Sequence, residues 1–190
     1  GISQKLSQER CLIQEKMRMR PLIFVSHLSQ DTKLAVKLKE SISGLLLDGV
    51  DFFVSSDGVS LLVGDNWLNT IQAKLLDAKL ILVLCNNRSI HKPWINFEAG
   101  GGWMHKTRVI PLCFDGVTKS NLPAPLSHLQ SVDLFDPVDF ANLLEMVSRV
   151  AGLRNPEFTA QDYVAKLKAT IQKDQEECAA VERDKVLEAI

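Results

Sequence analysis

Four short runs of apolar and β-branched residues recur along the chain at intervals of about thirty residues. They are Leu22–Val25, Val50–Val54, Leu80–Leu84 and Val109–Phe114. Short continuous apolar runs are typical of strands that are buried on both faces of a sheet. A weaker fifth run, Val132–Phe135, is followed by Asp136 and Pro137, a pair that favours the start of a helix. The spacing therefore predicts five strands separated by helix-sized segments.

The segments between these runs change to the apolar period of a helix. The first set is Leu34, Leu38, Ile42 and Leu45 after Ser29 as the expected N-cap, the second is Trp67, Ile71, Leu75 and Ala78 after Asp65, and the third is Phe140, Leu143, Val147 and Val150. Alternating strands and helices predict an α/β fold, a flavodoxin-like five-stranded parallel sheet with helices on both faces and flanking helices. In such sheets ligands bind beyond the carboxyl ends of the strands, where the strand order reverses.

The composition restricts the partners. Lys and Arg number 22 and Asp and Glu 23, so no excess of positive charge favours nucleic acid. No apolar stretch approaches the roughly 20 residues that cross a bilayer, so we expect no membrane contact. The four cysteines are far apart in sequence and show no metal-ligand spacing, which indicates reduced thiols, a cytoplasmic protein and no bound metal.

The chain of 190 residues is long enough for one sizeable core. We expect an entry helix or linker over residues 1–20, one domain over 21–152, and a helical extension or linker over 153–190. The last segment has partial heptad character, which indicates a solvated helix packed on the domain or a helix that joins copies or domains. We also expect a sensor or effector domain elsewhere in a longer protein.

Polar residues follow the first two predicted strands. After the first come Ser26, His27, Leu28 and Ser29, which could face a phosphate or a ribose, although a lone histidine at a strand end is more often structural. The second strand runs through Ser55 into a loop that ends at Gly64 and Asp65 and is longer than usual. Its tip, Leu61, Leu62 and Val63, is apolar, so it contacts a partner, covers a site or packs on the body.

A tryptophan and a glutamate follow the third predicted strand. Pro93 suits the first position of a helix, which places Trp94 and Glu98 one turn apart on the same face. An indole can stack on a flat base and desolvate a neighbouring carboxylate. The residues alone, however, favour a plainer interpretation, in which Glu98 is a solvated helix position and Trp94 anchors the core. Three glycines at 100–102 cost on the order of 2–3 kcal/mol in a helix and indicate close packing or a kink there.

In their order and spacing these motifs resemble the Toll/interleukin-1 receptor (TIR) family, over about Pro21 to Gly152. Phe24-Val25-Ser26-His27 is similar to that family's first-strand motif, and the long loop ending in Gly64-Asp65 resembles its BB loop, although the loop interior matches poorly. Trp94-x-x-x-Glu98 matches the W-x-x-x-E helix of the enzymatic plant, bacterial and axon-degeneration TIR domains.

The resemblance implies an NAD-cleaving enzyme, of bacterial type, in which Glu98 breaks the bond between nicotinamide and ribose. It implies substrate contacts from Ser26, His27, Leu28, Ser55, Gly64, Trp67 and Trp94, with NAD as substrate and no cofactor or metal. It also implies activation by self-association with other TIR domains, through an interface at Leu61, Leu62 and Val63. Immune defence or cell-death signalling is the role that such enzymes imply, whereas neither the product, ADP-ribose or a cyclic isomer, nor the trigger follows from the sequence.

Two other functions remain open at this point. One is a TIR adaptor that binds other TIR domains without catalysis, although receptor-type adaptors usually lack a glutamate at the position of Glu98. The other is an enzyme like the nucleoside deoxyribosyltransferases, which use a glutamate at a ribosyl carbon on a related sheet. The long second loop and the order of the motifs favour the TIR family.

Overall fold

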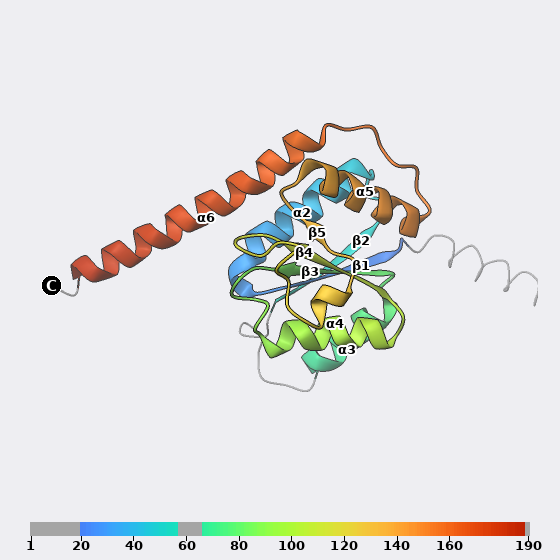
Figure 1. Ribbon diagram of the computed structural model, residues 1–190, viewed down its shortest axis with the longest axis horizontal. Coiled ribbons are helices and arrows are strands. Elements are labelled where there is room, and N and C mark those ends of the chain that lie inside the picture. Colours follow the sequence, from blue (N-terminus) through green and yellow to red (C-terminus); the bar gives the residue numbers. More distant parts are fainter. Residues whose placement is uncertain (1–19, 57–65, 189–190) are drawn as a thin grey trace, which may run out of the picture.

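The computed structural model describes residues 20–56 and 66–188. Figure 1 shows the elements in chain order. They are β1 (Leu22–His27), the short 3-10 helix η1 (Ser29–Asp31), α2 (Thr32–Leu45), β2 (Asp51–Ser56), α3 (Asn66–Asp77), β3 (Leu80–Cys85), α4 (Pro93–Met104), β4 (Arg108–Cys113), the 3-10 helix η2 (Leu126–His128), β5 (Val132–Asp133), α5 (Pro137–Ala151) and α6 (Ala160–Glu188).

The five strands form one parallel sheet in the order β2-β1-β3-β4-β5. This is the flavodoxin-like arrangement that the sequence predicts, and that prediction is confirmed. From β1 the chain adds β2 on one side of the sheet and then returns to add β3 on the other. The strand order therefore reverses at β1, which places the expected ligand site at the carboxyl ends of β1 and its two neighbours.

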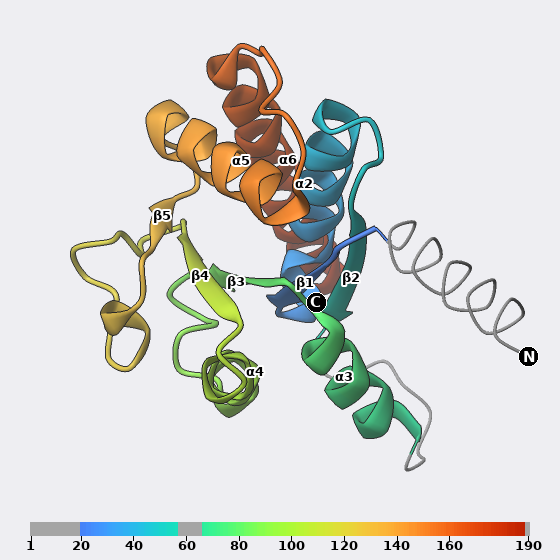
Figure 2. The ribbon, with the colours of Figure 1, turned by 90° about the vertical axis from the view of Figure 1, so that its right-hand side faces the viewer.

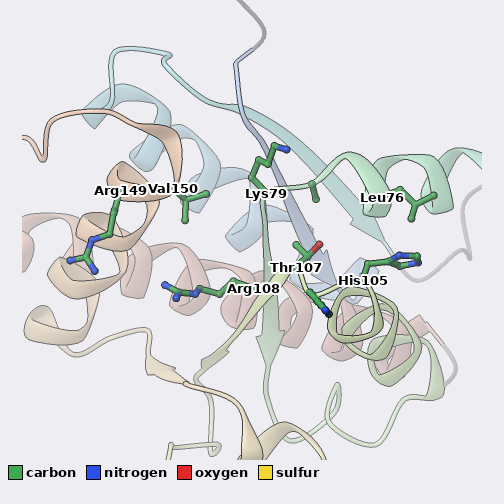
Figure 3. A pocket seen from close by; sticks show the side chains of 9 residues that line it. Leu76, Lys79, His105, Thr107, Arg108, Arg149 and Val150 are labelled. Carbon is green, nitrogen blue, oxygen red and sulfur yellow. The ribbon is translucent and has the colours of Figure 1, made fainter. Parts of the chain in front are cut away.

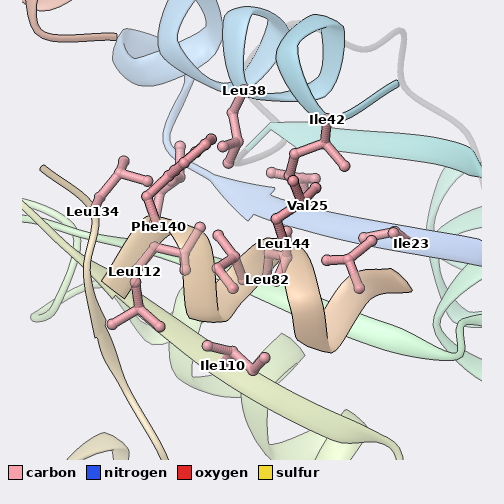
Figure 4. Close-up of a cluster of buried hydrophobic side chains, with 14 of the residues drawn as sticks. Ile23, Val25, Leu38, Ile42, Leu82, Ile110, Leu112, Leu134, Phe140 and Leu144 are labelled. Carbon is pink, nitrogen blue, oxygen red and sulfur yellow. The ribbon is translucent and has the colours of Figure 1, made fainter. Parts of the chain in front are cut away.

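Helices cover both faces of the sheet (Figures 1 and 2). Helices α2, α5 and α6 lie on one face and share a buried apolar cluster with it, whereas α3 and α4 lie on the other face with a cluster of their own. In Figure 4, Phe140 and Leu144 of α5 lie among strand residues such as Val25 and Leu82. Side chains alternate along each strand, so each buried strand supplies both clusters.

The ends of β1 and β2 differ from the apolar runs because pairing continues into polar residues. Strand β1 extends beyond Val25 to His27, where Ser26 and His27 pair with Ser55 and Ser56 of β2. Strand β3 continues to Cys85, whereas β5 is limited to Val132 and Asp133. The polar residues that extend β1 and β2 are those at the carboxyl edge.

Of the expected helix starts, Pro93 is confirmed as the first residue of α4, Asp65 lies outside the described residues, and the other two have different outcomes. Ser29 as N-cap is wrong, since Ser29 belongs to η1 and the N-cap of α2 is Asp31. The start at Asp136 is confirmed, because its side chain accepts a 2.9 Å hydrogen bond from the backbone N–H of Asp139 and Pro137 occupies the first turn of α5. This cap satisfies one of the unpaired donors at the helix start.

Helix α6 is much longer than the contact it makes with the domain. Val164 and Leu167 are buried in the cluster under α2 and α5, and Lys33 of α2 forms ion pairs with Asp174 and Glu177 of α6. Beyond these contacts the helix continues away from the sheet (Figure 1). Among residues 20–56 and 66–188, no helix combines the length and apolar character needed to span a membrane.

Candidate active site

Two serines face the same layer where β1 and β2 end. Ser26 and Ser55 are register partners, and both side chains are buried. Two residues earlier on the same strands, Phe24 and Phe53 pack with their ring centroids 5.3 Å apart. Because side chains alternate along a strand, the serines share the face of these rings, which α3 and α4 cover. Both hydroxyls therefore point toward that helical layer.

Helix α4 brings a carboxylate to these serines. Glu98 is 0% exposed, and Ser55 Oγ donates a 2.8 Å hydrogen bond to Oε1 of Glu98. Glu98 lies on the face of α4 that is turned toward the sheet. Ile95, three positions before it, and Ala99, the next residue, are both buried against the sheet. The interpretation of Glu98 as a solvated helix position is therefore wrong. Removing a carboxylate from water costs several kcal/mol, so this burial needs a reason.

One of the three glycines of α4 allows the helix to approach the sheet closely. A Cβ at Gly102 would overlap Ile81 and lie 2.8 Å from Cγ2 of Val109. At Gly100 a Cβ would meet nothing within 4 Å, and at Gly101 only Leu75 at 3.9 Å. The expected close packing is therefore confirmed at Gly102, and it lies one turn beyond Glu98 on the same helix.

Ser26 contributes a hydroxyl that the described residues do not satisfy. Its Oγ is buried and has no hydrogen-bond partner within residues 20–56 and 66–188. Leaving a buried polar atom without a partner costs about 1–3 kcal/mol. Such a group beside a buried carboxylate is a suitable partner for a hydroxyl of a bound ligand.

The arrangement of the strands agrees with the comparison with known protein families. Residues 23–147 match the family model described as TIR domain. The chain belongs to the TIR domain family. A search of curated proteins finds no match to it. The family match begins in β1 and ends in α5, so it includes all five strands and Glu98.

His27 lies apart from the two serines and Glu98. It is buried, its Nε2 lies 3.2 Å from Oγ1 of Thr32 at the start of α2, and its Nδ1 lies 3.5 Å from the carbonyl oxygen of Val25. As the next residue after Ser26 in β1, His27 faces the α2 side of the sheet. The structure therefore does not bring His27 into the Ser26–Ser55–Glu98 group.

Leu28 is on the side of Glu98. Its side chain is 2% exposed and belongs to the apolar cluster that α3 and α4 form with the sheet, together with Ile71 and Ile95. Leu28 therefore supports the layer beneath the carboxyl edge.

The remaining predicted site residues are placed only in part. Trp67 is the second residue of α3 and Trp94 the second of α4, one turn before Glu98, and their side chains lie outside the description. Leu61, Leu62, Val63 and Gly64 lie outside the described residues. Within the described residues, no group of three or more His, Cys, Asp or Glu side chains could hold a metal ion.

A buried polar network at the reversal point was not predicted from the sequence. Asp31, only 5% exposed, accepts hydrogen bonds of 3.1 and 3.0 Å from Nδ2 of Asn86, and Arg88 lies 3.4 Å away as its cation. Asn86 Oδ1 also accepts from the backbone N–H groups of Arg88 and Ser89. The network joins η1, after β1, to the turn after β3. The sequence feature that could have indicated this network is Asn86, an asparagine directly after a buried strand.

An apolar hollow adjoins the site on the other side of α4. It has a volume of about 450 Å³ and is lined by Ala99, Gly100, Pro125, Leu126, His128 and Leu129. Glu98 does not line it. The hollow therefore lies between α4 and the η2 segment, next to the carboxylate but separate from it.

Proposed function

We propose that this TIR domain cleaves NAD between nicotinamide and ribose, with Glu98 as the catalytic carboxylate. The observation that carries the proposal is a fully buried carboxylate bound to a serine at the edge where a flavodoxin-like sheet binds ligands. Family membership supports it, because TIR domains can be NAD-cleaving enzymes.

The chemistry requires few groups. The bond between C1′ of the ribose and the pyridinium nitrogen breaks, and both electrons leave with nicotinamide, which becomes neutral and needs no general acid. The ribose is left as an oxocarbenium cation, which an adjacent carboxylate stabilises in a site with few water molecules. Water then adds to C1′ and releases a proton. If the adenine adds in place of water, the product is cyclic.

Each neighbour has a defined role in this proposal. Ser55 orients the carboxylate through its hydrogen bond to Oε1, and Ser26 offers its hydroxyl to a ribose hydroxyl. Trp94 forms a wall for the nicotinamide or the ribose, while Leu28, Gly64 and Trp67 complete the substrate contacts. A carboxylate with no exposed surface reacts only after the residues that cover it move aside.

We also propose that activity depends on self-association, with Leu61, Leu62 and Val63 as the interface between copies. An association step would supply the rearrangement that exposes Glu98. Such control fits a bacterial, cytoplasmic protein that consumes NAD in defence or cell death. In that protein a sensor or effector domain would be joined to this one. If Leu62→Asp leaves both association and turnover unchanged, this part of the proposal fails.

The test is nicotinamide release from NAD, measured with concentrated wild-type protein and repeated with copies tethered or crowded together. Glu98→Gln keeps the shape of the side chain and an oxygen that can accept from Ser55, so it should fold and lose at least about a hundredfold in rate. Glu176→Gln on α6 makes the same chemical change at an exposed position and should retain full activity.

The other outcomes assign the site differently. If assembled wild-type protein releases no nicotinamide while it still self-associates, the domain is an adaptor and Glu98 is structural. If it transfers deoxyribose between bases but leaves NAD intact, it is a transferase. Equal activity of wild type and Glu98→Gln would remove Glu98 from the mechanism.

A further inference from the structure

A second pocket lies at the opposite, amino-terminal edge of the sheet (Figure 3). Its volume is about 550 Å³. Its lining comes from the end of α3 and the turn before β3, from the turn between α4 and β4 with the first residue of β4, and from the end of α5. The residues are Leu76, Ala78, Lys79, His105, Lys106, Thr107, Arg108, Arg149 and Val150. Leu80 of β3 pairs with Arg108 of β4, so Lys79 and Arg108 approach each other at the starts of adjacent strands.

The lining of this pocket carries positive charge and no carboxylate. Lys79, Lys106, Arg108 and Arg149 all contribute to it. Arg149 pairs with Glu145 at 2.6 Å, whereas the other three form no ion pair within the part of the chain that the structure describes. Elsewhere Lys33 and Lys119 each bind two carboxylates, whereas exposed cations such as Lys92 and Lys168 also form no ion pair with the described residues. The cations of the pocket repel one another, and an anion would relieve that repulsion.

The carboxyl ends of three helices offset part of this positive charge. Helices α3, α4 and α5 all end at this edge, and each carboxyl end carries the equivalent of roughly half a negative charge. Three helices thus supply roughly one and a half negative charges. Arg149 is assigned to Glu145, and Asp77 at the end of α3 adds one further negative charge. The three positive charges of Lys79, Lys106 and Arg108 still exceed the total. A net positive charge remains in the pocket.

The pocket also has an apolar side. In Figure 3, Arg108 and Arg149 reach toward one side of the pocket, while Leu76 and His105 lie at the other and Lys79 between them. Leu76 is 49% exposed and gives this side of the pocket an apolar surface. A ligand that fits both sides has an anionic group at one end and a flat apolar group at the other. The volume lies within the range of about 300–1,000 Å³ that small-ligand pockets have.

We propose that this pocket binds a nucleotide, with its phosphates on Arg108 and Lys79 and its base on Leu76. Arginine binds phosphate through two parallel N–H donors, and lysine adds a point charge. The site is separate from Glu98, which lies on the side of α4 facing the carboxyl edge, so the proposal stands whether or not the domain cleaves NAD.

The experiment is an NMR titration of the ¹⁵N-labelled protein with ADP, with pyrophosphate and adenosine as separate arms. ADP should shift the backbone amides of Lys79, Thr107, Arg108 and Val150. Pyrophosphate should shift the same amides with weaker affinity, and adenosine should shift them only at far higher concentration. Shifts confined to Ser26, Ser55 and Ala99 would mean that ADP binds only at the carboxyl edge, which overturns the proposal.

Paired variants separate a specific site from general charge. Lys79→Gln combined with Arg108→Gln should weaken ADP binding by at least about tenfold, with amide dispersion confirming that the variant folds. Lys92→Gln combined with Lys168→Gln removes the same charge from exposed positions outside the pocket and should leave binding unchanged. Equal weakening in both double variants, or pyrophosphate binding as tightly as ADP, overturns the nucleotide site. So does a single-stranded oligonucleotide that displaces ADP and binds more tightly.

Discussion

Ser55 on β2 and Glu98 on α4, 43 positions apart in the sequence, are joined by a 2.8 Å hydrogen bond in the interior of the domain. The bond connects the strand at one edge of the sheet to a helix that follows β3, so it passes across the end of β1. It fixes the position of one oxygen of the carboxylate. The orientation of Glu98 therefore depends on the pairing of β1 and β2 as well as on α4.

Ser55→Ala removes this donor, and we expect NAD cleavage to fall by about ten- to a hundredfold, because a hydrogen bond to a charged group contributes about 1.5–3 kcal/mol. The loss should be in kcat, since the bond orients the carboxylate rather than the substrate. Nicotinamide release over a range of NAD concentrations measures it. Ser120→Ala, at an exposed hydroxyl, is the control, and an unchanged kcat in Ser55→Ala would show that the bond is only structural.

Ser26→Ala should separate stability from binding. Because Ser26 Oγ is buried without a hydrogen-bond partner among the described residues, its removal should raise the free energy of unfolding by about 1 kcal/mol. If the hydroxyl meets a ribose hydroxyl, the same change raises KM for NAD about fivefold and leaves kcat near the wild-type value. Urea denaturation and steady-state kinetics test the two effects. A fall in stability would contradict the unsatisfied state of Ser26.

Gly102→Ala and Gly100→Ala form a matched pair on α4. A Cβ at Gly102 would press on Ile81 and Val109, which should destabilise the domain by about 1–3 kcal/mol despite the better helix propensity of alanine. At Gly100 a Cβ meets nothing within 4 Å, so alanine should stabilise by up to about 1 kcal/mol. Thermal unfolding of both variants gives the comparison. Similar melting temperatures would contradict the close approach of α4 to the sheet.

The sequence predicts the fold well because its strongest signals are local and repeat. Short apolar runs such as Leu80–Leu84 indicate a buried parallel strand, and the wide spacing between the runs leaves room for a crossover helix. The carboxyl ends of β1 and β2 were missed because apolar character stops before pairing does. In β5 the reverse holds, since the apolar run continues beyond the paired residues. Ser26 and Ser55 belong to their strands through backbone hydrogen bonds, which no side-chain pattern records.

The site was predicted less completely, since its contacts join distant segments. The position of Glu98 after Trp94 was visible, but its burial was not, although Ile95, Ala99 and Gly102 around it already mark an inward helical face. His27 was grouped with Ser26 because the two are neighbours in sequence, yet the alternation of side chains separates them. The bond from Asn86 to Asp31 spans 55 positions and follows only from the folded topology.

Cys85 and Cys113 are register partners on β3 and β4 and lie in the interior as free thiols. Burial raises the pKa of both thiols, and it raises that of Cys113 from 9.0 to about 12, so both stay protonated near neutral pH. We expect neither to react with iodoacetamide at pH 8 in the folded protein, whereas both react in urea.

The same shifts give the sign of a pH dependence. Above about pH 9 the unfolded chain loses thiol protons that the folded protein keeps, so the unfolded state is favoured and stability falls as the pH rises from about 9 toward 12. Urea denaturation of wild type and of Cys113→Ala at pH 8 and pH 10 measures this contribution, and the variant should lose less stability over that range. If stability falls equally with pH in the two proteins, Cys113 is not the cause of the pH dependence. In the alkylation experiment, reaction of native Cys113 at the rate of an exposed thiol would show that the strand edge opens.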